Sequence, residues 1–597
     1  MKSGKGILAG IVCAIMVLSS AGLLSLALPV KAADTVPSGG TLKIGWLQEQ
    51  DTLNPFVTNT VQGRMMLKLL YDTLLMYNKT LVPVANLATN WTKSTDGLTW
   101  TFTLVKNATY SDGTPLKASD VKFTFDLIKG MELSAYFDQV KFMSTVSADS
   151  DSQVTVVYSQ AVGTVESDMC LVPILPQHVW TGMTKEDILV STNAAPVGSS
   201  AWKLVSWTKG TSVVLDANKQ YWNGAPHIDR VVFQFFANSE TLVTALRNGE
   251  IDAITKELPP TSVGVLTQDS EIKVATNVDL YYREISINSG LTTHGNPTLR
   301  DVHVRQALTM ATDKTALVNL VQLGLAEPGT TIVQKAAPAW WDSTITPWPF
   351  NISRANELLN ESGYLDVAPH DGIRESPNGS VKMEYTLLVL SRWPEEIRTG
   401  QQLQTWWGQI GVKLHVESAD ANTINSYVYP DYTQDMFLWG YSGQPDPSFS
   451  LLIMLSNQIG NWNDCGYANA SYDTLFDQQA VATTYAARKA IVDDMQEIIF
   501  KDCPYIVLYY MTAKGAYRLD TFTGFVNMPT GLLSDVNIFT LREVHLITEE
   551  TKEPARADIT PWVVAIVAVV VAVAAIAFAL TRRKGGVKKD LEPPKTG

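Results

Sequence analysis

Cysteine and histidine are scarce in this sequence of 597 residues, which contains 4 Cys and 7 His. Cys13 lies in an apolar N-terminal stretch, and the remaining three cysteines, Cys170, Cys465 and Cys503, are widely spaced. An odd number at such spacing is not a disulfide framework, although one bridge is compatible with it. There is no Cys-x-x-Cys pair and no two histidines stand at i and i+4. The sequence therefore predicts neither a structural zinc site nor a metal site built from neighbouring residues.

The signatures of common catalytic motifs are also missing. There is no Walker A loop, no HExxH pattern and no dinucleotide-binding glycine pattern. Residues 440–444 (GYSGQ) resemble a nucleophile elbow, but the final glycine is absent. The net charge of −13 argues against a nucleic-acid partner, which favours a basic surface. We therefore expect a protein that is not an enzyme, requires no cofactor and does not bind nucleic acid.

Long hydrophobic runs are confined to the two ends of the chain. Residues 1–33 combine early lysines, an apolar run and a small-x-small pattern at Ala32, which predicts a secretory signal peptide. After a linker at residues 544–560, residues 561–580 form an apolar run that spans a bilayer at about 1.5 Å per residue. Because the tail at residues 581–597 is basic, the C-terminus is predicted to lie in the cytoplasm. We thus expect a single-pass protein of the cell membrane with its ectodomain outside.

Strand and helix patterns alternate between these ends, so the predicted fold class is mixed α/β. Residues 98–104 (LTWTFTL) alternate apolar side chains with threonine, as expected for a half-buried strand. Asp301, Asp313 and Ser353 each precede a helical pattern and are predicted N-caps. The stretch is too long for one hydrophobic core, so two or three domains are expected.

Four stretches resemble one protein family. Residues 90–125 (NWTKSTDGLTWTFTLVKNATYSDGTPLKASDVKFTF) closely resemble the signature of the peptide/nickel/oligosaccharide solute-binding proteins, family 5. Residues 196–235, 299–314 (LRDVHVRQALTMATDK) and 436–449 (MFLWGYSGQPDPSF) fit the same family in the same order. Members of this family are the ligand-capturing subunits of ABC importers, similar to oligopeptide- and dipeptide-binding proteins. A C-terminal anchor is an addition to the usual pattern and resembles arrangements found where there is no outer membrane.

The resemblance implies a bilobed, periplasmic-binding-protein-like fold of type II with an extra subdomain. Ligand would be trapped between the lobes by hinge closure. We expect lobe I at residues 41–285, with a subdomain at 78–195, lobe II at 286–503, and a return to lobe I at 504–543. The implied partners are an ABC permease and its ATPase subunits.

The loop within residues 436–449 is the main candidate for ligand contact, because loops at strand ends are favoured binding positions. Its aromatic side chains offer large contact areas with a polar group. The resemblance adds ligand-near positions in residues 279–288 (DLYYREISIN) and in residues 51–56. The candidate ligand-binding residues are Trp439, Tyr441, Ser442, Gly443, Gln444, Asp446, Tyr281, Tyr282, Asn288, Asn54 and Phe56.

The class of ligand depends on one position in this loop. In peptide-binding members of the family an Asp pairs with the α-amino group of the peptide, and Gln444 takes that position here. A neutral amide cannot supply an ion pair to an ammonium group. Either Asp446 replaces the missing partner, or the ligand is neutral, such as an oligosaccharide. We rank peptides first, oligosaccharides second and nickel complexes third; an extracellular hydrolase or a sensor ectodomain are the alternatives from other classes.

Overall fold

A computed structural model describes residues 36–547, apart from residues 59, 257, 291–293, 368 and 392. The described residues as far as Leu546 belong to one compact unit. Within this part of the chain no helix combines the length and the apolar character needed to cross a membrane. Several predicted segments lie outside the described residues: the signal peptide (1–33), most of the linker (548–560), the transmembrane helix (561–580) and the basic tail (581–597).

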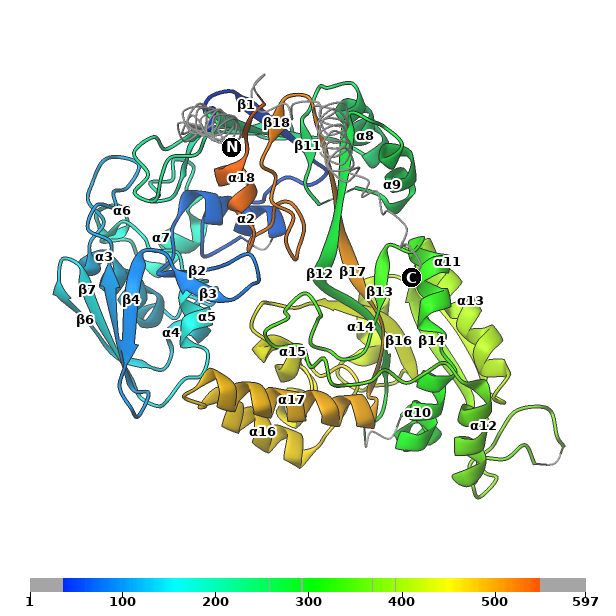
Figure 1. Cartoon of the computed structure of the whole chain (residues 1–597). Coiled ribbons are helices and arrows are strands. Elements are labelled where there is room, and N and C mark those ends of the chain that lie inside the picture. The colour runs from blue at the N-terminus through cyan, green and yellow to red at the C-terminus, as the bar shows by residue number, and fades with distance from the viewer. Residues whose placement is uncertain are drawn as a thin grey trace, which may run out of the picture. The chain divides into compact units, whose positions relative to one another are not determined.

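A long antiparallel strand pair, β12 (Ile272–Ile287) and β17 (Tyr505–Arg518), connects the two lobes (Figure 1). The register of the pairing shifts twice, between Val278 and Tyr282 and between Arg283 and Glu284. Strands on both sides extend this pair into one continuous sheet. In spatial order they are β15 (Lys413–Ala419), β14 (Glu384–Leu390) and β16 (Met436–Ser442) on one side, then β11 (Ala253–Ile254), β1 (Thr41–Trp46), β10 (Arg230–Phe235), β9 (Ser212–Ala217) and β8 (Trp202–Thr208) on the other, with β13 (Ala326–Pro328) beside β17.

Lobe I contains the half of the sheet from β11 to β8. The alternation in β1 buries Leu42, Ile44 and Trp46, and β1 lies parallel to both β10 and β11. This placement makes β1 a central strand of the lobe. The other elements of lobe I are α2 (Val61–Leu70), β2 (Leu75–Tyr77), β3 (Pro83–Ala85), α8 (Ser239–Arg247), α9 (Pro260–Thr267), β18 (Phe522–Thr523), α18 (Phe539–Glu543) and β19 (His545–Leu546).

A four-stranded antiparallel sheet forms a subdomain next to lobe I. Its order is β4 (Ala88–Lys93), β5 (Thr99–Leu104), β7 (Gln153–Tyr158) and β6 (Met143–Ser150). Trp100, Phe102 and Leu104 of β5 are buried, so the predicted half-buried strand is confirmed. The helices of the subdomain are α3 (Ala118–Gly130), α4 (Phe137–Val140), α5 (Val165–Met169), α6 (Gln177–Trp180) and α7 (Lys185–Val190).

Lobe II is built around β14, β16 and the remaining halves of β12 and β17. One apolar cluster contains side chains of α10 to α13, and a second contains side chains of α15 to α17. Both clusters include residues of β12 and β17, so these strands are covered on both faces. The helices are α10 (Val302–Met310), α11 (Lys314–Gln322), α12 (Ile352–Glu361), α13 (Pro394–Gly408), α14 (Ala421–Val428), α15 (Ser448–Leu452), α16 (Ala470–Ala480) and α17 (Tyr485–Asp502), with 3-10 turns at η1 (Pro297–Arg300) and η2 (Ser456–Gln458).

Two of the three predicted N-caps are confirmed. Asp301 accepts a hydrogen bond from the His303 backbone N–H at 2.9 Å. Asp313 accepts one from the Ala316 N–H at 2.9 Å. The prediction for Ser353 is wrong, because the Asn351 side chain accepts from the N–H of residue 354 and α12 begins at residue 352. Asn is as good an N-cap as Ser, so the earlier of the two polar residues starts the helix.

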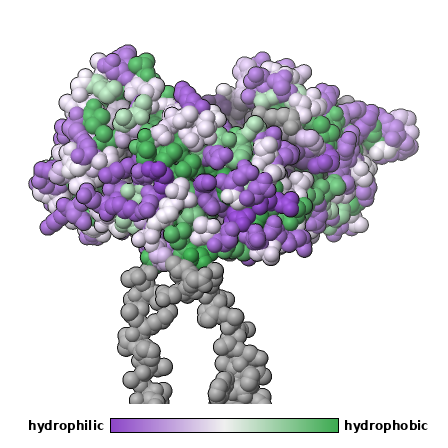
Figure 2. Space-filling view, turned by 90° about the horizontal axis from the view of Figure 1, so that it is seen from above, coloured by the Kyte–Doolittle hydropathy of each residue, from purple (hydrophilic) through white to green (hydrophobic). Residues whose placement is uncertain are grey.

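Hydrophilic residues cover most of the face shown in Figure 2, with smaller hydrophobic areas among them. Large apolar side chains that are exposed come from separate elements, for example Val190 in α7, Val265 in α9 and Leu323 after α11. Single exposed apolar residues are normal on protein surfaces. These positions therefore indicate no particular function.

Glu284 is an unusual acid in the core, near the C-terminal end of β12. Its side chain is fully buried, and neither carboxyl oxygen has a hydrogen-bond partner among the described residues. On the two neighbouring strands it faces Trp439 and Val507. Burial, reinforced by the nearby Asp464 carboxyl, raises the pKa of Glu284 well above its ordinary value, while Arg283 opposes the shift. A neutral, protonated Glu284 follows from this position.

Replacing Glu284 with Gln should make folding stability less dependent on pH. Because the folded state holds the proton more tightly, the unfolded chain releases it first as pH rises above the ordinary value of 4.5. Glu284 should then lower the free energy of unfolding of the wild type by about 1.4 kcal/mol for each pH unit. This loss should continue until the pH reaches the pKa of Glu284 in the folded protein. Urea unfolding should find Glu284→Gln equal to wild type near pH 4 and more stable at pH 8.

The matched control is Glu417→Gln, at an exposed position in β15. It should leave the difference between pH 4 and pH 8 unchanged. A Glu284→Gln protein that is less stable than wild type at pH 8 would contradict the assignment of a neutral buried acid.

Candidate functional site

The predicted loop follows β16, and Tyr441 anchors its start to lobe II. The Tyr441 hydroxyl donates to the Asp464 carboxyl at 2.8 Å, which also accepts from Ser286 at 2.9 Å and from Tyr505. Tyr282 lies opposite Tyr441 on β12, with ring centroids 6.3 Å apart, and is fully buried. Burial raises the pKa of Asp464, and the three hydroxyl donors oppose that shift. Tyr441 and Tyr282 are thus fixed parts of the frame behind the loop.

The edge of β16 is open beyond its pairing with β14. That pairing involves only Met436 and Phe437 of β16. The Gly443 N–H donates to the Leu280 carbonyl at 2.5 Å. Because antiparallel strands alternate their hydrogen-bonding direction, the backbone groups of Gly440 and Ser442 point away from β12. The side chain of Ser442 is exposed. The end of β16 therefore presents main-chain donors and acceptors.

Tyr281 and Gly440 are packed against each other at this edge. A Cβ atom on Gly440 would lie 2.7 Å from the Tyr281 hydroxyl and 2.5 Å from the Tyr282 carbonyl oxygen, so only glycine fits. The Tyr281 hydroxyl accepts from Arg283 at 3.0 Å, and the Arg283 guanidinium lies 3.9 Å from the centre of the Trp393 ring. Tyr281 is half-buried and remains partly accessible beside the open edge.

Four of the candidate ligand residues make contacts within the protein. Asn54 is fully buried and donates to the carbonyls of Ile188 at 2.6 Å and Ser191 at 2.8 Å. Phe56 packs edge-on against Trp180 at 5.7 Å, within lobe I. Asn288 donates to the carbonyls of residues 432 and 434 at 2.8 and 2.9 Å. Trp439 is half-buried against Phe437, with ring centroids 6.0 Å apart. Asn54, Phe56 and Asn288 line none of the cavities described below.

Asp446 forms a buried ion pair that the sequence did not reveal. Its two carboxylate oxygens accept from the Arg488 guanidinium at 2.5 and 2.7 Å, and both side chains are almost fully buried. Although burial opposes ionisation, Arg488 holds the pKa of Asp446 below its ordinary value. The carboxylate is thus already paired, and this contradicts the idea that Asp446 replaces Gln444 as the partner of a ligand ammonium. Arg488 lies 42 residues away in sequence, so no local pattern announces it.

Gln444 extends across to lobe I. Its side chain is exposed and lines a cavity of about 170 Å³, the Gln444 cavity, whose other walls belong to lobe I and the subdomain. Three tyrosines line these walls together with Arg64, Lys68 and Asp535: they are Tyr71, Tyr77 and Tyr136. Burial lowers the pKa of Lys68, whose ammonium group donates to the Cys170 carbonyl. Gln444 is thus the predicted ligand residue that lines a cavity together with residues of lobe I.

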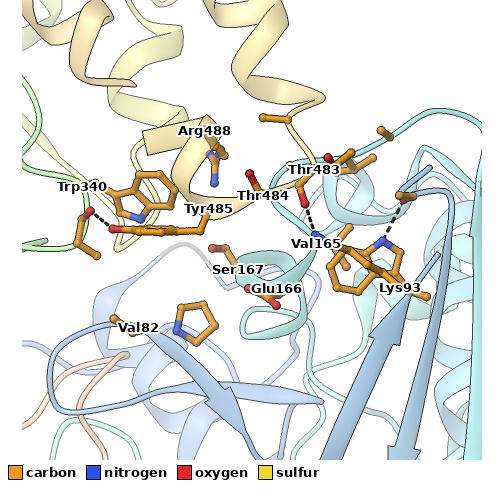
Figure 3. Close-up of a pocket in the computed structure, with 18 of the residues that line it drawn as sticks. Val82, Lys93, Val165, Glu166, Ser167, Trp340, Thr483, Thr484, Tyr485 and Arg488 are labelled. Carbon is orange, nitrogen blue, oxygen red and sulfur yellow. Dashed lines mark hydrogen bonds between the residues drawn. The ribbon is translucent and has the colours of Figure 1, made fainter. Parts of the chain in front are cut away.

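A second and larger cavity lies between the subdomain and α17 (Figure 3). Its volume is about 600 Å³, and we call it the seam cavity. Figure 3 shows Trp340, Tyr485 and Arg488 on one side, with Val165 and Ser167 facing them. Trp340 and Tyr485 pack at 5.0 Å between ring centroids, and Arg488 lies 4.6 Å from the Trp340 ring centre. None of these residues stands out in the sequence, because they come from distant segments.

The two lobes touch directly beside the seam cavity. Ser167 donates to Asp446 at 3.1 Å, and the Gly163 N–H donates to the Ala480 carbonyl at 2.6 Å. Lys93 donates to the Thr483 carbonyl. A Cβ atom on Gly163 would lie 2.7 Å from the carbonyl oxygen of residue 479, a distance too short for any side chain. We call this contact the interlobe seam.

Asp168 adds a titratable group next to the seam. Burial raises its pKa to about 8, the nearby Asp446 adds to the shift, and the hydrogen bond from Thr164 and the charge of Arg488 oppose it. Asp168 lies in the subdomain and Asp446 in lobe II. Their mutual repulsion would therefore oppose closure once Asp168 is ionised.

Another hollow of about 610 Å³ lies between residues 256 and 258–261 of lobe I and helices α11 and α13 of lobe II. Charged side chains line it, including Lys256, Lys514, Glu395 and Arg398. Among the described residues, no group of three or more His, Cys, Asp or Glu side chains is arranged to hold a metal ion. Cys170, Cys465 and Cys503 are buried and unbridged, so the single disulfide that the sequence allowed is not formed.

Gly163→Val should keep the lobes apart at the seam. The added side chain would collide with backbone carbonyls that cannot rotate away. Because Gly163 is not among the glycines with positive φ, valine adds no backbone strain there. Small-angle X-ray scattering should give a larger radius of gyration than wild type, with little change in melting temperature. The control is Gly264→Val in α9, where a Cβ atom meets nothing within 4 Å. Identical scattering curves for Gly163→Val and wild type would refute the role of this contact in closure.

Comparisons with known proteins identify the family. The family model "Bacterial extracellular solute-binding proteins, family 5 Middle" matches residues 82–462. The oligopeptide-binding protein AppA of Bacillus subtilis is 25% identical over 501 residues, covering 80% of this chain and 88% of AppA.

Solved structures share the fold. The substrate-binding protein CtaP of Listeria monocytogenes superposes with a TM-score of 0.73 at 23% identity, covering 85% of this chain and 99% of CtaP. AppA of B. subtilis, solved with a nonapeptide, gives a TM-score of 0.66 at 22% identity, covering 86% of this chain and 100% of AppA. These likenesses support the bilobed α/β fold. Because the family model spans more than half of the sequence, the chain belongs to the bacterial extracellular solute-binding proteins, family 5, which are binding proteins for transport and not enzymes.

Proposed function

We propose that this protein is the extracytoplasmic substrate-binding subunit of an ABC importer and captures peptides reversibly between its lobes. It would release them to a membrane permease driven by ATPase subunits. The observation that carries this proposal is the pair of cavities that lie between lobes joined through β12 and β17. Such an arrangement can enclose a ligand when the lobes close and release it when they part.

Peptides are favoured over other ligands by the main-chain groups at the end of β16. An extended peptide can add to an open strand edge through backbone hydrogen bonds, which a sugar cannot reproduce in the same pattern. The name of AppA, an oligopeptide-binding protein, supports the same class. Gln444 is uncharged, so recognition would depend on the peptide backbone more than on a charged N-terminus.

The proposed contact residues follow from accessibility. Tyr281, Gly440, Ser442, Gly443 and Gln444 would touch the ligand, because they lie at the open edge or on the Gln444 cavity. Behind them, Trp439, Tyr441, Tyr282 and Asp446 would position the loop without carrying charge to the ligand.

We retain the lobe assignments as proposals: lobe I at residues 41–285 and 504–543, its subdomain at 78–195 and lobe II at 286–503. In support, the subdomain sheet lies wholly within residues 88–158. The limit between residues 285 and 286 falls inside β12, which continues from one lobe into the other.

We also propose that residues 561–580 anchor the protein in the cell membrane, with the basic tail at 581–597 in the cytoplasm and the ectodomain outside. The support is compositional: an uninterrupted apolar run is followed directly by Arg582, Arg583 and Lys584. The predicted signal peptide at residues 1–33 would direct export.

A thermal-shift screen tests the ligand class. Residues 34–557 contain the whole compact unit that ends at Leu546 and can be screened against separate pools of short peptides, oligosaccharides and nickel–histidine complexes. A ligand of the folded state stabilises it by roughly 2.7 kcal/mol at a hundredfold excess over its dissociation constant. We expect a shift with peptides. A shift with oligosaccharides or nickel complexes and none with peptides would overturn the peptide assignment.

Truncation tests the anchor. Deleting residues 558–597 should move the protein from the membrane fraction to the medium or the soluble extracytoplasmic fraction. Deleting only residues 585–597, which keeps the apolar run, should leave it in the membrane. If the longer deletion stays membrane-bound, residues 561–580 are not the anchor.

A further inference from the structure

We propose that the seam cavity is a second ligand subsite that accepts an uncharged, apolar side chain of the captured peptide. This inference rests on the proposed function and adds a selectivity to it. Arg488 of the Asp446–Arg488 ion pair lines the seam cavity, and no residue of the predicted ligand set does.

The walls of the seam cavity are mainly apolar and come from three separate places. The turn between β2 and β3 supplies Leu81 and Val82, the subdomain supplies Val162 and Val165, and lobe II supplies Trp340. Figure 3 shows Val82 and Val165 on opposite sides of the space that Trp340 also borders. Such a lining favours the transfer of an apolar side chain out of water.

The charged groups at the seam cavity already have partners. Arg488 donates to both Asp446 oxygens and, through Nε, to Gln479 at 2.9 Å. Lys93 donates to the Thr483 carbonyl and lies 5.2 Å from the Trp100 ring centre. Glu166 accepts from the Trp91 indole N–H at 2.8 Å. A charged ligand group would have to break one of these pairs, so the cavity discriminates against charge.

Volume also points to this cavity. Pockets that hold small ligands have volumes of roughly 300 to 1,000 Å³. The Gln444 cavity, with a volume of about 170 Å³, is smaller than this. At about 600 Å³ the seam cavity falls within that range. The hollow beside α11 and α13 is equally large, but charged side chains line it. Of these three cavities, the seam cavity is therefore the one whose volume and lining suit a bulky apolar group.

Occupancy of the seam cavity would be coupled to closure. One wall belongs to the subdomain and the other to α17, and the walls are held together by Ser167, Gly163 and Lys93. A side chain buried between them contacts both walls only while the lobes touch. Such a side chain binds the closed state better than the open one and shifts the population toward it.

Isothermal titration with five-residue peptides tests the proposal. The peptides consist of Ala and Ser, with Phe, Leu, Ser or Glu placed at each position in turn. At one position we expect Phe and Leu to bind about tenfold or more tightly than Ser, since burial of such a side chain is worth more than one decade in affinity. Glu at that position should bind no better than Ser.

Two variants connect this preference to the seam cavity. Val162→Trp fills the cavity from the subdomain and should abolish the advantage of Phe over Ser. The matched control Val190→Trp makes the same change at a side chain that is 79% exposed in α7 and should keep the advantage. Tyr485→Ala removes part of the opposite wall and should reduce the advantage of Phe. Because the Tyr485 side chain is 55% exposed, this variant should still fold.

The outcomes separate this proposal from the proposed function. Binding of all peptides with equal affinity would overturn the apolar subsite and leave peptide capture intact. A Phe advantage that persists in both Val162→Trp and Tyr485→Ala would place the apolar subsite elsewhere and refute the assignment. Failure of every peptide to bind would overturn the proposed function itself.

Discussion

The hydrogen-bonded pair formed by β12 and β17 is the constraint on which the rest of the molecule depends. The two strands belong to both lobes, so the sheets of the two lobes form one continuous structure and not two bodies on flexible loops. The longer of the two irregularities in their pairing lies between Val278 and Tyr282, where residues 279–281 have no partner on β17. Relative movement of the lobes must therefore pass through a twist or bend of this pair, and the candidate ligand residue Tyr281 stands directly at the interruption.

Buried acids in this protein have different roles because their partners differ. Asp446 faces a guanidinium and stays ionised, and it links the loop after β16 to α17. Asp464 accepts from three hydroxyl groups and holds Tyr441 in place. Glu284 has no hydrogen-bond partner among the described residues and is kept neutral by burial. None of these three carboxyl groups lines the Gln444 cavity, so they belong to the frame behind the loop.

Features that depend on local sequence were predictable, and features that depend on distant contacts were not. The alternation in β5 and the caps at Asp301 and Asp313 are encoded within a few residues and were predicted correctly. The family, the α/β class and the bilobed fold followed from motifs of the same local kind. By contrast, the ion pair between Asp446 and Arg488 joins residues 42 positions apart. The hydrogen bond from Asn54 to the Ile188 carbonyl joins residues 134 positions apart. A polar residue in a loop looks the same in sequence whether it binds a ligand or its own backbone.

The three described cysteines have a practical consequence for studying motion. All are buried, and burial raises the pKa of each thiol, to about 11 in the case of Cys503. Buried thiols that stay protonated react slowly with alkylating reagents and oxidants. Surface cysteines introduced on either side of the seam could thus carry spectroscopic labels without prior removal of these three native residues. The distance between the lobes could then be followed directly in solution as ligand is added.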